Sequence, residues 1–236
     1  MKSKAIGIDL AKNVFQVCGV SEHIKPQFIK KIKRHALIEF MLQQPPTTVF
    51  MEACYSSSYW AREIEELGHT AKLIPAQHVT PFVRGNKNDR NDALAIVEAS
   101  QRPYIRFVPI KTAHQQEIMC LHRVRDRLIK NKTATSNQAR GLLSEFGIIF
   151  DLGKKAFISG MKNVIANEQT SFRLKTIMTD LFDEYQTLLN RIEKIEDELV
   201  LFIKQSTHGK ILLSIPGIGT IITSASFGRF AQYRCN

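Results

Sequence analysis

The order of apolar patterns over the first hundred residues is the feature that most constrains the fold of this chain. Three strand-like segments come first, at residues 5–11, 14–20 and 27–33. The gaps between them are too short for a crossover, which predicts antiparallel neighbours. Helix-like and strand-like patterns then alternate, at residues 35–44, 47–51, 56–67, 70–74 and from residue 89 onward. Because such alternation requires parallel neighbours, the sequence predicts an α/β fold with a mixed sheet and flanking helices.

Two acidic residues belong to the predicted central strands. Asp9 lies in an otherwise apolar strand, where a carboxylate must be paired, hydrogen-bonded or bound to a cation. The alternative is that Asp9 ends the strand and caps a turn. Glu52 closes the fourth strand. Sites in such sheets form where the connections between strands diverge, so we expect Asp9 and Glu52 on adjacent strands at one edge.

A second acidic pair opens the helix that follows the last strand. Asp89 and Asp92 are three residues apart, which places them on one helix face. Two like charges at that distance repel unless a cation or a proton lies between them. The alternative is ordinary, because Asp at a helix start caps the helix and matches its dipole. Convergence of four acids from three separate segments would indicate a cation site more specifically than any single acid does.

The net charge of +11 favours a polyanionic partner, most simply nucleic acid. Residues 111–175 hold twelve Lys or Arg against five Asp or Glu, so most of the excess lies there. A long helix is predicted over residues 113–147, with Val124 and Phe146 among its apolar members. Contacts to the backbone of DNA or RNA are expected from its basic side chains, which are Arg123, Arg125, Arg127, Lys130 and Lys132. A merely solvated helix face is the alternative.

Apolar residues between Leu174 and Phe202 recur at spacings of four and three, which is typical of a heptad seam. The seam could pair with the basic helix of the same chain or with a second subunit. Residues 211–228 carry no charge but contain Pro216 and three glycines. We expect a buried helix–turn–helix there and no membrane span. In its turn, Gly217 and Gly219 would let backbone N–H groups approach a phosphate.

The four cysteines are scattered and form no CxxC pair, which disfavours a zinc site or a disulfide framework. A reducing, cytoplasmic setting is therefore expected. The N-terminus leads into a short apolar strand and has no signal-peptide core.

The acids stand in three motifs: Gly7-Ile8-Asp9, Met51-Glu52-Ala53-Cys54-Tyr55 and Lys87-Asn88-Asp89-Arg90-Asn91-Asp92-Ala93. These motifs resemble the DEDD signature of transposases of the insertion-sequence-110 family, whose first domain has a RuvC-like, ribonuclease-H-like fold. Further similarity lies at Gly68-His69, at residues 137–143, which include Arg140, and at residues 215–219. The resemblance implies four catalytic, metal-binding acids: Asp9, Glu52, Asp89 and Asp92. Arg140, Gly217 and Gly219 join the residues expected to bind nucleic acid.

Carboxylate oxygens without His or Cys suit Mg²⁺ or Mn²⁺. Two such ions can stabilise the attacking and leaving oxygens at a phosphodiester. The resemblance implies a DNA transposase or recombinase that cleaves and exchanges strands at the ends of its own insertion sequence and at the target. It also implies a structured guide RNA encoded by the element, and a homo-oligomer joined by the coiled coil.

Three domains are expected from the same resemblance. They are a RuvC-like catalytic domain over residues 1–110, a basic helix with a heptad coiled coil over 111–207, and the start of a C-terminal serine transposase domain over 208–236. The family carries its serine nucleophile in a later stretch, and no position here matches it. The chain is therefore expected to be a fragment.

Three alternatives stay open from the sequence. The chain could be a non-catalytic remnant that binds nucleic acid, dimerises and inhibits the full-length transposase. It could be a nuclease that acts on branched DNA like a Holliday-junction resolvase. A sugar-kinase-like or actin-like ATPase is disfavoured, because Ala11-Lys12-Asn13 replaces the glycine-rich phosphate loop that those proteins need after the first strand.

Overall fold

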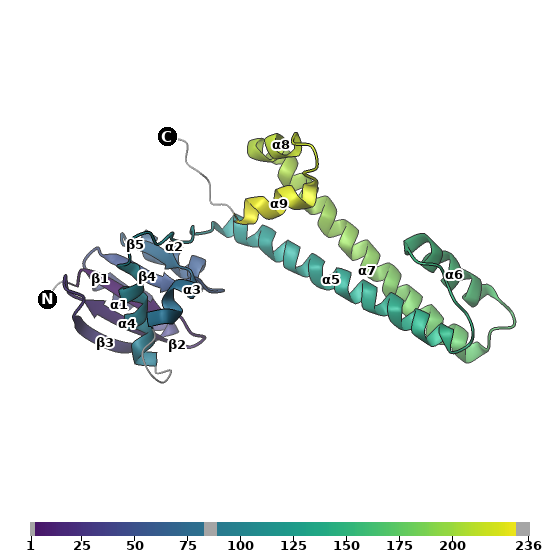
Figure 1. Ribbon diagram of the computed structural model, residues 1–236, viewed down its shortest axis with the longest axis horizontal. Helices are drawn as coiled ribbons and strands as arrows, with labels where there is room; N and C mark the ends of the chain where they lie inside the picture. Colours follow the sequence, from purple (N-terminus) through teal and green to yellow (C-terminus); the bar gives the residue numbers. More distant parts are fainter. Residues whose placement is uncertain (1–2, 83–88, 230–236) are drawn as a thin grey trace. The chain divides into compact units, whose positions relative to one another are not determined.

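The computed structural model describes residues 3–82 and 89–229, and for residues 89–91, 208 and 228–229 it describes the backbone alone (Figure 1). The chain divides into two compact units, the first ending at His114 and the second spanning Gln115–Arg229. Each unit has its own core.

The first unit is built on a five-stranded mixed sheet in the order β3-β2-β1-β4-β5. Its strands are β1 (Ala5–Asp9), β2 (Val14–Val20), β3 (Pro26–Lys33), β4 (Thr48–Glu52) and β5 (Thr70–Ile74). β1 pairs antiparallel with β2, and β2 with β3, whereas β1 pairs parallel with β4, and β4 with β5. The predicted α/β fold with a mixed sheet is confirmed, and the central position of β1 and β4 follows from this order.

Helices cover both faces of the sheet. They are α1 (Leu37–Leu42), α2 (Ser57–Glu66), α3 (Ala76–Val79) and α4 (Asp89–Ser100), with 3-10 turns η1 (Arg34–Ala36) and η2 (Thr80–Phe82). The expected helix at residues 35–44 thus begins as the η1 turn. Ile6 and Ile8 of β1 lie in a core with Trp60 of α2, whereas Ala5 lies in a second core with Ala93 of α4. Because side chains alternate along a strand, α1 and α2 cover one face and α4 covers the other.

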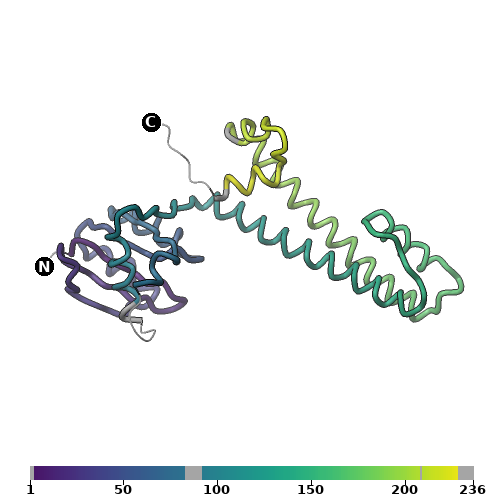
Figure 2. Tube along the Cα trace, in the orientation of Figure 1, coloured from purple at the N-terminus to yellow at the C-terminus, as the bar shows by residue number. Residues whose placement is uncertain are grey.

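The second unit is helical. Its elements are α5 (Ala113–Ser144), α6 (Lys154–Ala166), α7 (Phe172–Gln205), α8 (Thr207–Leu213) and α9 (Thr220–Arg229). Helices α5 and α7 run side by side in opposite directions (Figure 2). Leu128 packs against Leu188 and Ile192 near the middle of the pair, and Leu143 shares a core with Leu174 at one end. These buried residues of the heptad seam therefore pack within the chain. This is the alternative in which the seam pairs with the basic helix of the same chain.

Two apolar expectations for the second unit were wrong. Val124 is 38% exposed and Phe146 is 61% exposed, so neither belongs to the buried stripe of α5. The uncharged stretch does form two helices about a turn, in which Gly217 adopts a left-handed φ of 86°. It is not buried as expected, because Ile211 is 59% exposed and Ile222 is 55% exposed. No helix in the described part of the chain is both long enough and apolar enough to cross a bilayer.

Candidate functional site

Asp9 and Glu52 are the last residues of the two central parallel strands. Ile8 pairs with Met51, so the following residues of β1 and β4 lie next to each other at the carboxyl-terminal edge. Gly7 faces α4, and Phe50 lies in the core that α4 completes. Because alternate residues share a face, Asp9 and Glu52 lie on the α4 side of the sheet.

Helix α4 brings a third carboxylate to this edge. The helix lies directly against β1, since a Cβ built on Gly7 would be 2.4 Å from the carbonyl oxygen of Ala93. Asp92 is the residue before Ala93, and it is half-buried. Burial raises the pKa of the Glu52 carboxyl above its usual range, and the negative charge of Asp92 raises that pKa further. Asp92 and Glu52 are therefore close enough to repel each other.

The fourth predicted acid is only partly described. Asp89 is the first residue of α4, but its side chain lies outside the described residues. Within residues 3–82 and 92–207, and in the few later side chains that are described, no three His, Cys, Asp or Glu side chains form a cluster tight enough to hold a metal ion. The grouping of all four acids stays a prediction.

Gln16 is a neighbour of these acids that sequence reasoning missed. It pairs with Asp9 across the β1–β2 ladder and is 6% exposed. Its position alternates with Phe15 and Val17, which lie on the α2 face, so Gln16 shares the α4 side with Asp9. In the described part of the chain its Oε1 has no hydrogen-bond partner. The sequence signal for Gln16 was a polar residue inside an apolar strand. The register of β2 shows its relevance, because it places Gln16 beside Asp9.

This set of groups suits a hard divalent cation. It offers carboxylate oxygens and one buried carboxamide oxygen that no described residue hydrogen-bonds, and Mg²⁺ and Mn²⁺ prefer oxygen ligands. A cation would also offset the repulsion that raises the pKa of Glu52. The chemistry of the donors therefore fits the predicted cofactor.

The basic residues of α5 that are predicted to bind nucleic acid differ in exposure and in their interactions within the fold. Arg123, Arg127 and Lys130 are exposed, and Lys132 is half-buried. Arg125 is half-buried, and its guanidinium lies 2.6 Å from the Glu196 carboxylate of α7. Contact of these residues with phosphates stays a prediction, and Arg125 could make it only by giving up the ion pair that holds α5 against α7.

The remaining predicted contacts lie at two other places. Arg140 donates hydrogen bonds to the carbonyl oxygens of Phe150 (3.0 Å) and Gly153 (3.4 Å) and lies over the Phe157 ring. Its guanidinium thus holds the segment before α6. Gly217 and Gly219 lie exposed in the turn between α8 and α9, where a Cβ would meet no atom within 4 Å. The backbone there is open to a ligand.

Comparison with known proteins gives consistent relatives. A family model of transposases of the DEDD, IS110 type matches residues 6–148. A probable family 20 transposase of Pseudomonas aeruginosa is 43% identical over 99% of this chain and 71% of its own length. The transposase for insertion sequence element IS1111A of Coxiella burnetii is 39% identical over 98% of this chain and 65% of its own length. The transposase for insertion sequence element IS1328 of Yersinia enterocolitica is 41% identical over 93% of this chain and 65% of its own length. The chain spans about two thirds of these relatives.

Proposed function

Because the chain belongs to the IS110 family of DEDD transposases, we propose that its first unit binds a divalent cation and supplies the carboxylate site for metal-dependent cleavage and exchange of the DNA strands of its insertion sequence. One observation carries the proposal. Asp9 and Glu52 end adjacent parallel strands on the face that α4 covers, and the charge of Asp92 acts on Glu52. Transposases act on DNA, so a phosphodiester is the substrate group that such a site would meet.

A ribonuclease-H-like architecture is part of this proposal. Strand β2 runs against the other four strands, and the sheet order is β3-β2-β1-β4-β5. Both features support the architecture that the resemblance implies, in which the acids gather at the carboxyl ends of the first and fourth strands. The position of Asp9 and Glu52 is consistent with it.

The roles of the residues follow from their positions. Mg²⁺ or Mn²⁺, when bound, would stabilise negative charge on the attacking and leaving oxygens of the phosphodiester. Asp9 and Glu52 would hold the cation from the sheet, and Asp92 would do so from α4. Asp89 is the remaining candidate ligand, and Gln16 would offer its carboxamide oxygen to the cation or to a water on it.

The guide RNA and the homo-oligomer remain proposals that rest on the family. Since the buried seam residues of α7 pack within the chain, a subunit contact through this helix would have to use its exposed apolar side chains. Phe172 is 86% exposed, Ile177 is 43% exposed and Leu201 is 60% exposed. These are the positions at which we expect a second subunit.

Replacing Glu52 by Gln should raise the stability of the metal-free protein near neutral pH. The folded-state pKa of Glu52 lies above its ordinary value, so the charged carboxylate opposes folding. This group favours the folded state most below its unfolded pKa, and that contribution is lost as pH rises through the folded pKa. Because solvent screens this half-buried group, we expect the free energy of unfolding to rise by less than about 1 kcal/mol near pH 7.5, and not measurably near pH 4. Urea unfolding at both pH values measures this.

Repeating the same unfolding experiment with a divalent cation tests whether Glu52 binds metal. Mn²⁺ should stabilise the wild-type protein and should stabilise Glu52→Gln less, because the variant has lost one charged ligand. The matched control is Glu65→Gln, which changes an exposed carboxylate on α2 and should leave both measurements unaltered. Equal Mn²⁺ responses in wild type and Glu52→Gln would count against Glu52 as a ligand.

Removing Arg127 and Lys130 together should reduce the salt dependence of duplex DNA binding. Both are exposed on α5, and each phosphate contact contributes about 0.9 to the slope of log K against log salt. The double alanine variant should therefore bind with a slope smaller by about 2. The control removes Arg191 and Lys194, two exposed cations of α7, and so has the same net charge. Equal slopes in the two variants would favour a solvated face over a binding surface.

A further inference from the structure

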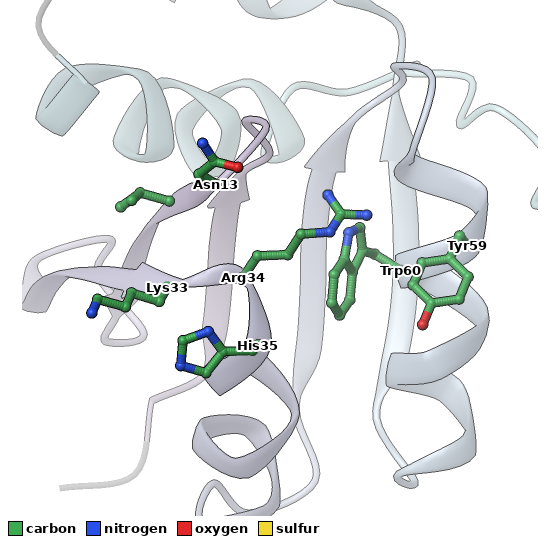
Figure 3. Close-up of a pocket in the computed structure, with 7 residues that line it drawn as sticks. Asn13, Lys33, Arg34, His35, Tyr59 and Trp60 are labelled. Carbon is green, nitrogen blue, oxygen red and sulfur yellow. The ribbon is translucent and has the colours of Figure 1, made fainter.

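A pocket of about 650 Å³ lies beside the start of β2, and nothing in the carboxylate chemistry uses it. It is lined by Asn13, Val14, Lys33, Arg34, His35, Tyr59 and Trp60 (Figure 3). The lining holds three consecutive basic residues and two aromatic residues, and it holds no carboxylate. Its volume is within the range of pockets that hold small ligands. A pocket of this composition suits an anion that also carries a flat ring.

Two hydrogen-bond donors, the indole of Trp60 and the guanidinium of Arg34, lie close together in the pocket. Trp60 is 4% exposed, and its indole Nε1 has no hydrogen-bond partner among the described residues. The guanidinium carbon of Arg34 lies 5.1 Å from the centre of the indole ring, and Figure 3 shows the Arg34 side chain extending toward that ring. An indole N–H and a guanidinium can only donate, so neither can satisfy the other. A bound group that carries acceptors could satisfy both donors, and phosphate oxygens match the planar donors of arginine.

Tyr59 provides a flat aromatic surface on which a base could stack. Its side chain is 42% exposed, and its ring lies 5.1 Å from that of Trp60 in an edge-to-face arrangement. The packing of Tyr59 on Trp60 fixes the ring at the rim of the pocket. Bases of single strands stack on such aromatic side chains, whereas bases within a duplex are already stacked on each other.

We propose that this pocket binds one nucleotide of a single-stranded nucleic acid, with the phosphate at Arg34 and the Trp60 Nε1–H and the base against Tyr59. Asn13, Lys33 and His35 also line the pocket, and the two basic residues add positive charge to it. Single-stranded DNA and single-stranded RNA share this chemistry, and the experiment below distinguishes them.

The place of the pocket in the fold connects it with the carboxylates, so the inference rests on the proposed function. Val14 begins β2 and pairs with Lys33 at the end of β3. Because Asp9 pairs with Gln16, these ends lie at the same sheet edge as the carboxyl ends of β1 and β4. Tyr59 and Trp60 belong to the first turn of α2, which follows Glu52. A single strand of nucleic acid that crosses this sheet edge can therefore have one nucleotide at the carboxylates on one face and a neighbouring nucleotide in the pocket on the other face.

The experiment uses the tryptophan as its own probe, because Trp60 is the single tryptophan of the chain. The full chain is titrated with a fluorescein-labelled single-stranded dT oligonucleotide, with the matching U oligoribonucleotide, and with a blunt DNA duplex. Fluorescein anisotropy reports any binding, and Trp60 emission excited at the red edge reports occupancy of the pocket. Both single strands, or one of them, should change Trp60 emission saturably, and the duplex should not.

Two variants test the assignment of groups. Arg34→Gln removes the charge that faces the phosphate, and Tyr59→Ala removes the stacking surface; each should weaken single-strand binding about tenfold. Lys25→Ala is the matched control, because it removes an exposed cation of the same unit far from the pocket lining. Thermal unfolding checks that each variant is folded, and Tyr59→Ala remains decisive if Arg34→Gln is not.

Each outcome decides between the two proposals. A rise in anisotropy with unchanged Trp60 emission would overturn the pocket and leave nucleic-acid binding by the chain intact. No rise in anisotropy with any oligonucleotide would overturn both. A Trp60 response with DNA alone assigns the pocket to a displaced strand of the element or target, and a response with RNA alone assigns it to an RNA partner.

Discussion

Replacing Asp92 by Ala in a cleavage-competent protein should abolish metal-dependent cleavage of DNA that carries the ends of the element, with a loss of about 10³-fold or more. A bound divalent ion contributes several kcal/mol to stabilising the charge of a phosphoryl-transfer transition state, and each 1.36 kcal/mol changes the rate tenfold. Asp92 lies on the first turn of α4, where its charge already acts on Glu52. Removing it would take away one of the ligands that α4 offers to the cation in the proposed site. Single-turnover cleavage with Mg²⁺ or Mn²⁺ measures the effect.

Asp9→Ala should give a loss of the same size, since Asp9 ends the strand next to β4 and would hold the cation from the sheet in the proposed site. Mn²⁺ affinity, measured by calorimetry, should fall in both variants while their unfolding transitions remain cooperative. The control is Glu65→Ala, which removes an exposed carboxylate of the same unit. Unchanged cleavage and unchanged Mn²⁺ affinity in both Asp variants would remove these acids from the site.

The sheet could be predicted from sequence because its pairing follows from the lengths of the connections. Short gaps on either side of β2 allow only hairpins, whereas α1 and α2 separate strands that must be parallel. The lengths do not decide whether β4 lies beside β1 or beside β3, and the structure places it beside β1, which makes Asp9 and Glu52 neighbours. The contribution of Gln16 could not be foreseen, because its meaning depends on its pairing with Asp9 and on the face that it shares with α4.

The helical unit was less predictable, because the same residue types serve opposite roles there. Arg125 pairs with Glu196, which is 71 positions away, whereas Arg127 two residues later is exposed. Charge counting along α5 cannot separate them, since the partner is set by how α7 packs. Phe146 fits the apolar period of the helix, but it lies beyond Ser144, the last residue of α5, and is exposed.

Replacing Gly7 by Ala should destabilise the first unit and disturb the site together. The new methyl group would lie 2.4 Å from the Ala93 carbonyl oxygen and 2.5 Å from Cγ2 of Val97. The Val97 side chain can rotate, but the carbonyl belongs to the backbone of α4, so the helix itself has to move away from β1. Overpacking of this kind costs about 1–3 kcal/mol. Urea unfolding should show that loss.

Movement of α4 also carries Asp92 away from Glu52, so Gly7→Ala should weaken Mn²⁺ binding although Gly7 has no side chain and touches no cation. Gly141→Ala is the matched control: Gly141 lies in α5, a Cβ there meets no atom within 4 Å, and alanine should stabilise the helix by about 0.5–1 kcal/mol. If Gly7→Ala instead unfolds like the wild type and binds Mn²⁺ as tightly, α4 does not rest on β1. The convergence of Asp92 with the strand-end carboxylates would then have no structural support, because the close approach of Ala93 to Gly7 is what brings the helix to that edge.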